Sequence, residues 1–99
     1  MSYQIEFSPE SLDHLEKFRK FEQRRITNWI EKQLKNEPLK ATRQRKVLRS
    51  NLIATRELRI GDFRVYYDVD EAANVVLIRA IGMKKHNRVF IGGEEADLP

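Results

Sequence analysis

The chain has 99 residues, no cysteine and a formal net charge of +4. This length predicts one domain, spanning residues 1–99, and the lack of cysteine excludes a fold held together by disulfide bonds. The sequence has no apolar run as long as a membrane span, no pattern of metal ligands and no glycine-rich phosphate loop, so we expect a cytoplasmic protein with no membrane contact, no metal and no cofactor.

The N-terminal part of the sequence predicts one strand and then two helices. Ser8-Pro9 marks the change from strand to helix, because serine is a favoured N-cap and proline a favoured first helical residue. The second helix is expected from about residue 22 to residue 35, where Asn36 and Pro38 end it. Apolar residues recur at the period of a strand in Tyr3, Ile5 and Phe7, and at helical spacing in Leu12, Leu15 and Phe18 and in Ile26, Trp29, Ile30 and Leu34.

Residues 57–67 predict a β-hairpin, because apolar and charged side chains alternate on both sides of Gly61-Asp62. Glycine adopts a positive φ without steric cost, so this pair suits a two-residue type II′ turn. Such a turn fixes the register of the two strands. It places Leu58, Ile60, Phe63 and Val65 on the face that packs under the helices, and Glu57, Arg59, Arg64 and Tyr66 on the other face.

The hairpin is expected to begin an antiparallel sheet. Its strands are predicted at residues 54–60 and 63–69, followed by a central strand at residues 74–83 and a short strand at residues 89–91. The predicted fold is therefore α+β: an N-terminal strand, an antiparallel two-helix hairpin and a three- to four-stranded antiparallel meander, with the helices on one face of a twisted sheet. We expect the other face to be open and residues 92–99 to form a loose acidic tail.

Basic side chains gather on both sides of the hairpin. Residues 40–59 carry seven basic side chains and one acidic one, in a stretch whose first part is expected to be a loop with a short strand near Val47-Leu48. Residues 79–88 add four basic side chains. If the two segments meet in space, they favour a polyanion such as RNA, or an acidic partner chain. The alternative is a solvated basic surface without a ligand.

The residues expected on or near the open face suit metal-free cleavage of RNA. In that reaction the 2′-hydroxyl of the substrate attacks the adjacent phosphate. The protein takes a proton from the attacking hydroxyl, gives one to the leaving oxygen and neutralises the charge that grows on the phosphorane. Arginine suits the last task because its planar fork binds two phosphate oxygens.

Three stretches, residues 57–67, residues 80–85 and Val89-Phe90, resemble the RelE/ParE superfamily of toxins from bacterial type II toxin-antitoxin systems. The order of the predicted elements along the chain is similar too. The resemblance implies a compact RelE-like toxin that is neutralised by a cognate antitoxin protein. It is closer to the RelE branch, the endoribonucleases (mRNA interferases) that cut mRNA in the ribosomal A site, and it therefore implies mRNA and the ribosome as further partners.

The resemblance also implies roles for individual residues. Arg64 occupies the position of the family's catalytic arginine, and Lys84 stands where the RelE branch often has an arginine. Other ribonuclease branches use a glutamate as base and a histidine as acid, which implies these roles for Glu57 and His86. The candidate RNA contacts are Arg59, Tyr66, Lys85, Arg45, Lys46 and Arg49.

Several alternatives stay open at this point. The sequence departs from the RelE branch at Thr55 and Glu57, where that branch tends to have lysines, and at Phe90, where it tends to have tyrosine. The alternative for Glu57 is an ion pair within the hairpin, and the alternative for Tyr66 is a packing role. For the whole protein, the alternatives are a ParE-like inhibitor that blocks DNA gyrase by binding, and an inactive toxin homologue that only binds an antitoxin.

Overall fold

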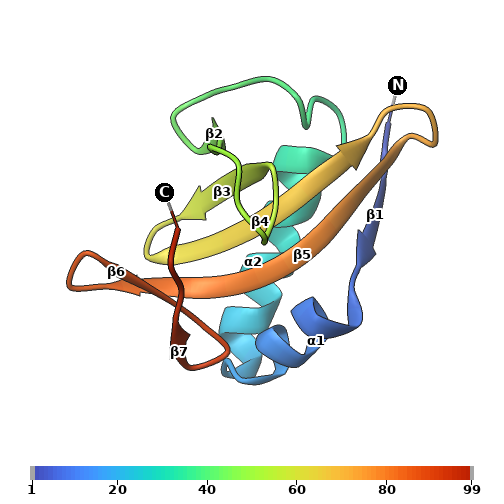
Figure 1. Ribbon diagram of the computed structural model, residues 1–99. Coiled ribbons are helices and arrows are strands. Elements are labelled where there is room, and N and C mark those ends of the chain that lie inside the picture. The colour runs from blue at the N-terminus through green and yellow to red at the C-terminus, as the bar shows by residue number, and fades with distance from the viewer. Residues whose placement is uncertain (1, 99) are drawn as a thin grey trace.

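The computed structural model describes residues 2–98 and has the predicted α+β fold, with two helices against an open sheet of mostly antiparallel strands (Figure 1). The predicted helices and strands are present, with ends that differ by a few residues, and β7 is an addition to them. In chain order the elements are β1 (Gln4–Phe7), α1 (Pro9–Glu16), α2 (Lys20–Leu34), β2 (Arg45–Val47), β3 (Arg56–Ile60), β4 (Phe63–Asp70), β5 (Val75–Lys85), β6 (Arg88–Ile91) and β7 (Glu94–Glu95).

The long strand β5 joins the parts of the sheet. The strand order is β2-β3-β4-β5-β6-β7, and β1 pairs with β5 outside this path. One edge of β5 pairs with β4; the other edge pairs in parallel with β1 at residues 75–78 and antiparallel with β6 at residues 82–85. Figure 1 shows β5 crossing the molecule with α2 behind it. A bulge at Tyr66/Tyr67 leaves Arg79 of β5 without a partner residue in β4.

Capping groups set the boundaries of the helices. The Oγ of Ser8 accepts a hydrogen bond from the backbone N–H of Ser11 at 3.1 Å, and Pro9 follows as the first residue of α1. At α2 the backbone N–H of Arg19 donates to the Glu22 carboxylate at 3.0 Å, so this helix begins two residues before its predicted start. Within residues 2–98, neither helix combines the length and the apolar character that crossing a membrane requires.

The main core lies between the helices and the sheet, and it orients the hairpin. The predicted register is confirmed, because Ile60 pairs with Phe63 and Leu58 pairs with Val65. Gly61 has a φ of +56°, as the first central residue of a type II′ turn requires. The other buried members of this core are Leu15, Ile26, Ile30, Leu34, Tyr67, Val76, Ile78 and Ile81, and Phe18 and Trp29 pack against it. The alternate residues of the hairpin therefore face away from the helices.

Part of the sheet face away from the helices is covered, and for this part the prediction of an open face was wrong. Leucine and isoleucine side chains of the β2–β3 loop (residues 48–55) and of the C-terminal segment pack onto it, and Figure 1 shows both segments in front of the sheet. We call this layer the second core. Its buried members are Ala54, Tyr66 and Ala80, and Leu48, Ile53, Val89, Ile91 and Leu98 pack against them.

Residues 92–98 belong to this cover, so the prediction of a loose tail was also wrong. Glu94–Glu95 form β7 by pairing with β6, and the backbone N–H of Ala96 donates to the carbonyl of Val89 at 2.8 Å. Leu98 packs against the second core. Met1 and Pro99, the ends of the predicted domain, lie outside the described residues.

His14 lies off the apolar stripe of α1, which predicts an exposed side chain, but it is half-buried against β5. Its Nδ1 accepts a hydrogen bond from the backbone N–H of Ile81 at 3.2 Å. Burial, and then the positive charge of Lys17, lower the pKa of His14 from its usual value of 6.5. Neutral His14 therefore links α1 to β5.

We expect His14 to make the fold less stable in acid. The unfolded chain protonates this imidazole near pH 6.5, whereas the folded chain resists protonation until a lower pH. The contribution of His14 to the free energy of unfolding should therefore not change with pH above about pH 6.5. Below about pH 6.5 it should decrease as the pH falls. Urea unfolding of wild type and His14→Gln at about pH 5.5 and about pH 7.5 measures the effect.

The matched control for this prediction is His86→Gln, because His86 is exposed in the β5–β6 turn. The His14→Gln protein should lose part of the pH dependence of stability, and the His86→Gln protein should keep it. Equal pH dependence in wild type and His14→Gln would contradict the role of the hydrogen bond to Ile81.

Candidate functional site

The strand register brings charged side chains together on the face away from the helices. Across β3 and β4, Arg59 lies opposite Arg64. Across β4 and β5, Arg64 pairs with Gly82, so Lys84 lies diagonally from Arg64 on the same face. The backbone N–H of Lys84 also donates to the carbonyl of Asp62 at 2.8 Å, which holds β5 beside the turn. We call the following set the charged face: Lys46, Glu57, Arg59, Arg64 and Lys84.

Glu57 is a buried carboxylate within the charged face. The residue is 6 % exposed, and its Oε1 accepts a hydrogen bond from Nε of Arg59 at 2.9 Å. Lys46, which is exposed, lies opposite Glu57 on β2. The ion pair that the sequence left open is therefore present, and it runs along β3 rather than across the hairpin. Among residues 2–98, Oε2 of Glu57 has no hydrogen-bond or ion-pair partner, so this oxygen remains available.

Arg64 is also buried, and the hairpin turn anchors its guanidinium. Nη1 donates to the carbonyl of Gly61 at 2.7 Å and to the carbonyl of Phe63 at 2.9 Å. Within the described part of the chain, Nε and Nη2 donate to no protein atom. These two nitrogens form one edge of the planar guanidinium, which is the geometry that binds two oxygens of a phosphate.

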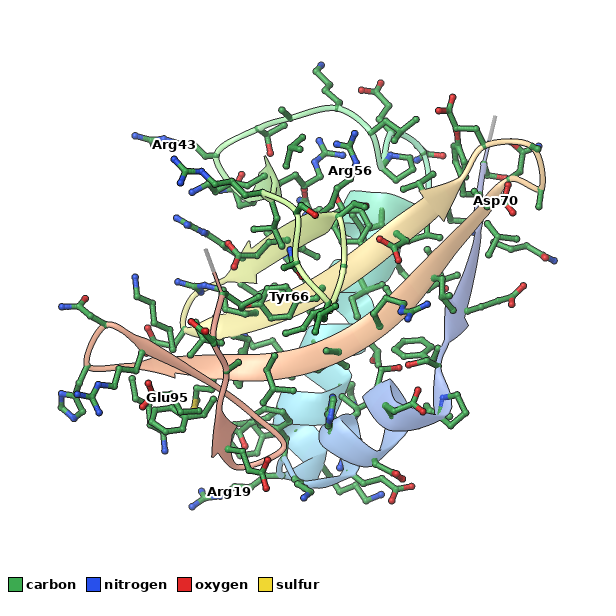
Figure 2. All side chains as sticks on the ribbon, viewed as in Figure 1. Arg19, Arg43, Arg56, Tyr66, Asp70 and Glu95 are labelled. Atoms are coloured by element: carbon green, nitrogen blue, oxygen red, sulfur yellow. The ribbon has the colours of Figure 1, made fainter. Side chains whose placement is uncertain are left out.

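Tyr66 lies beneath the charged face and belongs to the second core. It is fully buried near the centre of the sheet. The β2–β3 loop and the C-terminal segment pack against it, as Figure 2 shows. A base cannot stack on a ring that is covered in this way, so the predicted RNA contact by Tyr66 is wrong and the packing alternative is correct. Burial, and then the negative charge of Glu57, raise the pKa of the Tyr66 phenol, which keeps it protonated.

Arg45 faces the helices, away from the charged face, and has a structural role. Its Nη1 donates to the backbone carbonyl of Gln33, in the last turn of α2, and to that of Glu37, in the segment after the helix. It therefore supplies a positive charge and a donor at the C-terminal end of this helix. Arg49, by contrast, is exposed in the β2–β3 loop, and like Lys46 it keeps the contact with RNA as a prediction.

Two further predicted residues lie away from the charged face. Lys85 borders a hollow of about 600 Å³ on the helix side of β6, which Phe90 also lines. His86 is in the turn between β5 and β6, where its φ is +51°. It follows Gly82 by four residues, about 13 Å along an extended strand. The structure therefore does not bring His86 to Arg64.

Two departures from the RelE pattern, Thr55 and Phe90, have structural roles. The backbone N–H and the Oγ1 of Thr55 donate to Oδ1 of Asp68 at 2.7 and 2.8 Å, which ties the β2–β3 loop to β4. Phe90 pairs with Met83 and lines the hollow on the helix side. Neither residue adds an acid or base to the charged face. Within residues 2–98, no three histidine, aspartate or glutamate side chains gather as metal ligands would.

Comparison with known proteins identifies the family. The model of the ParE toxin of the type II toxin-antitoxin system parDE matches residues 5–88, which run from β1 to the first residue of β6. The chain belongs to this family of toxins. No curated protein matches the sequence.

Two solved structures resemble this ParE-family toxin. One is a chain of the RelBE2 toxin-antitoxin complex from Mycobacterium tuberculosis, with 25% identity, a TM-score of 0.74, and coverage of 85% of this chain and 100% of that chain. The other is a chain of the archaeal RelE-RelB complex from Pyrococcus horikoshii OT3, with 22% identity, a TM-score of 0.68, and coverage of 87% and 99%. Together with the family match, these likenesses confirm the predicted RelE/ParE superfamily.

Sequence reasoning about this toxin missed the groups that lie under the charged face. Tyr66 was placed on the correct face, but its burial depends on Leu48, Ile53 and Leu98, which belong to short apolar runs without the period of a helix or strand. The hydrogen bond between His14 and Ile81 joins residues that are 67 positions apart, so no local sequence pattern predicts it. The sequence signal for the cover was the presence of these short apolar runs in otherwise polar segments.

Proposed function

We propose that this toxin is a metal-independent endoribonuclease that cleaves mRNA at the ribosome and so inhibits translation. The observation that supports this function is that Glu57 and Arg64 are both buried on the same face of the sheet. The Glu57 carboxylate has one oxygen without a partner, and the Arg64 guanidinium has one edge without a partner, among the described residues. These are the groups that an attack by the 2′-hydroxyl on the adjacent phosphate requires.

In this proposal each group has one task. Glu57 takes the proton from the 2′-hydroxyl, whose oxygen attacks the phosphorus, and the bond from phosphorus to the 5′ oxygen breaks. Arg64 binds two oxygens of the phosphate through Nε and Nη2 and stabilises the charge of the phosphorane. Lys84 lies diagonally from Arg64 and stabilises the charge on the leaving 5′ oxygen, which takes its proton from water. We leave His86 out of this set because of its distance along β5.

The same proposal includes partners. Both similar solved structures are complexes of a toxin with an antitoxin, which supports a cognate antitoxin for this chain. The exposed basic residues Lys46 and Arg49 extend the charged face toward the β2–β3 loop, where they favour the phosphates of mRNA and ribosomal RNA. Acidic residues of an antitoxin would compete for the same positive field.

A second candidate function is the block of DNA gyrase by binding alone. The observation that favours it is the family match itself, which is to the ParE toxin of the parDE system. Among residues 2–98, no histidine lies beside Arg64 to act as general acid for the leaving oxygen, which also fits a protein that binds without cleaving.

Brief induction of the toxin in bacteria, followed by primer extension on a translated reporter mRNA, distinguishes the two functions. We expect growth arrest together with new 5′ ends at defined positions within codons. Growth arrest with intact mRNA and inhibited supercoiling by purified gyrase would reject the ribonuclease and support the second candidate. Intact mRNA, active gyrase and normal growth would indicate a homologue that only binds an antitoxin.

A further inference from the structure

The hydroxyl of Tyr66 is a buried polar group without a partner. The residue is fully buried, and its Oη forms no hydrogen bond of normal geometry with any described residue. A buried hydroxyl without a hydrogen bond is unfavourable compared with one in water, and phenylalanine would fill the same space without that cost. The presence of a hydroxyl at this position therefore points to an interaction that the second core does not need for packing.

The comparison with Tyr67 sharpens this point. Tyr67 is also fully buried, on the other face of β4, and its hydroxyl donates to the carbonyl of Pro38 at 3.0 Å. That hydrogen bond holds the segment after α2 against the sheet, so Tyr67 has an evident structural role. The Tyr66 hydroxyl has no such backbone acceptor.

Glu57 is the carboxylate that lies opposite Tyr66 in the sheet. The two residues pair across β3 and β4, so their side chains lie on the same face. Arg59 and Arg64 also act on the phenol with their charges, so the hydroxyl lies among the groups of the charged face. Arg59 occupies Oε1 of Glu57, whereas Oε2 has no partner among the described residues.

We propose that Tyr66 is a positioning residue, whose hydroxyl donates a hydrogen bond to Oε2 of Glu57 and holds this carboxylate in the orientation that removes the proton from the 2′-hydroxyl of RNA. The inference rests on the proposed ribonuclease function for its consequence, but the contact itself does not. With Arg59 on Oε1 and Tyr66 on Oε2, both oxygens are fixed, and each retains a lone pair for the substrate. Tyr66 is buried in the second core, so it holds Glu57 without contacting the RNA.

The contact is tested by NMR on protein labelled with ¹³C at the Tyr Cζ position. A buried phenolic proton that is hydrogen-bonded to a carboxylate exchanges slowly with water, and we expect such a signal for Tyr66, assigned by its loss in Tyr66→Phe. Glu57→Gln should move this signal, because the acceptor loses its charge. A signal at the same position in wild type and Glu57→Gln would overturn the proposal, and so would rapid exchange in wild type.

The consequence is tested by the rate of RNA cleavage as a function of pH. Tyr66→Phe should lower the rate about 10-fold and move the acidic limb of the pH–rate profile to higher pH, because the charged carboxylate loses a donor. The matched control is Tyr67→Phe, which removes a buried hydroxyl from the same strand and should leave the profile in place. Identical profiles for wild type and Tyr66→Phe would overturn the positioning role.

The two proposals fail in different ways. Wild-type protein that leaves mRNA intact rejects the ribonuclease, and the NMR experiment then still decides whether Tyr66 holds Glu57. Cleavage by wild type together with an unmoved phenolic signal in Glu57→Gln rejects the role of Tyr66 and leaves the ribonuclease standing.

Discussion

Arg64→Ala is expected to reduce the rate of mRNA cleavage by about 100-fold or more, and to abolish growth arrest on induction. The reason is geometric. The turn carbonyls hold Nη1 of Arg64, so Nε and Nη2 are already oriented when the phosphate arrives. Alanine removes both the charge and this preorganised edge. Cleavage of a reporter mRNA after brief induction, at equal protein levels, measures the loss.

Two further variants show whether the loss of cleavage is specific to the guanidinium of Arg64. Arg64→Lys keeps a positive charge but has no planar fork, so we expect an activity between those of wild type and Arg64→Ala. Arg24→Ala removes an exposed arginine of α2 and should cleave as wild type does. Circular dichroism of each variant checks the fold, because Arg64 also stabilises the turn through Gly61 and Phe63. A folded Arg64→Ala protein with wild-type cleavage would remove Arg64 from the site.

Gly82→Ala is expected to destabilise the fold strongly. A Cβ at this position would lie 2.8 Å from Cγ1 of Ile91 and closer still to the carbonyl oxygen of Phe90. The second contact is with backbone, which cannot rotate away, so β6 must move from β5. Overpacking of this kind costs about 1–3 kcal/mol. In a domain of this size that corresponds to a melting temperature lower by roughly 5–20 °C.

Thermal unfolding of Gly82→Ala and of Gly93→Asn measures this effect against a control. Gly93 has nothing within 4 Å of an added Cβ, and its φ of +85° lies in the region that asparagine tolerates better than most residues. Gly93→Asn should therefore shift the melting temperature much less than Gly82→Ala. An unchanged melting temperature for Gly82→Ala would show that β6 is not held against β5 as described.

Local patterns were sufficient to predict the hairpin and its two faces. Period-two alternation identifies β3 and β4, and Gly61 fixes their register, so the face of Arg64 follows from counting residues. The helices followed equally from the spacing of apolar residues. These features depend on contacts between residues that are close in sequence, which is why the sequence alone reveals them.

The cover over the second face depends on contacts between distant parts of the chain, and no local pattern predicts it. Leu48 and Ile53 stand in a polar, basic loop, and Leu98 stands in an acidic stretch. Each becomes partly buried only because Tyr66 and Ala80 offer a common surface. The prediction of an open face failed for this reason, and with it the prediction that Tyr66 contacts RNA.

The position of His86 was missed for a different reason. Residues 84 and 85 were not included in the predicted central strand, because Gly82 is a residue that often ends a strand. In the structure β5 continues to Lys85 by pairing with β6. The extra length carries His86 to the tip of a hairpin, away from Arg64, although the residue types themselves suit an acid–base pair.

The place of β5 in the sheet has a consequence for the order of folding. β1 has no strand partner other than β5 within residues 2–98, and β4 and β6 pair with β5 as well. The pairing of Gln4 with Val75 joins distant parts of the chain, and pairings of this kind form slowly because a long loop must close first. We therefore expect the sheet to be completed late in folding. The charged face likewise lacks Lys84 until β5 has paired with β4.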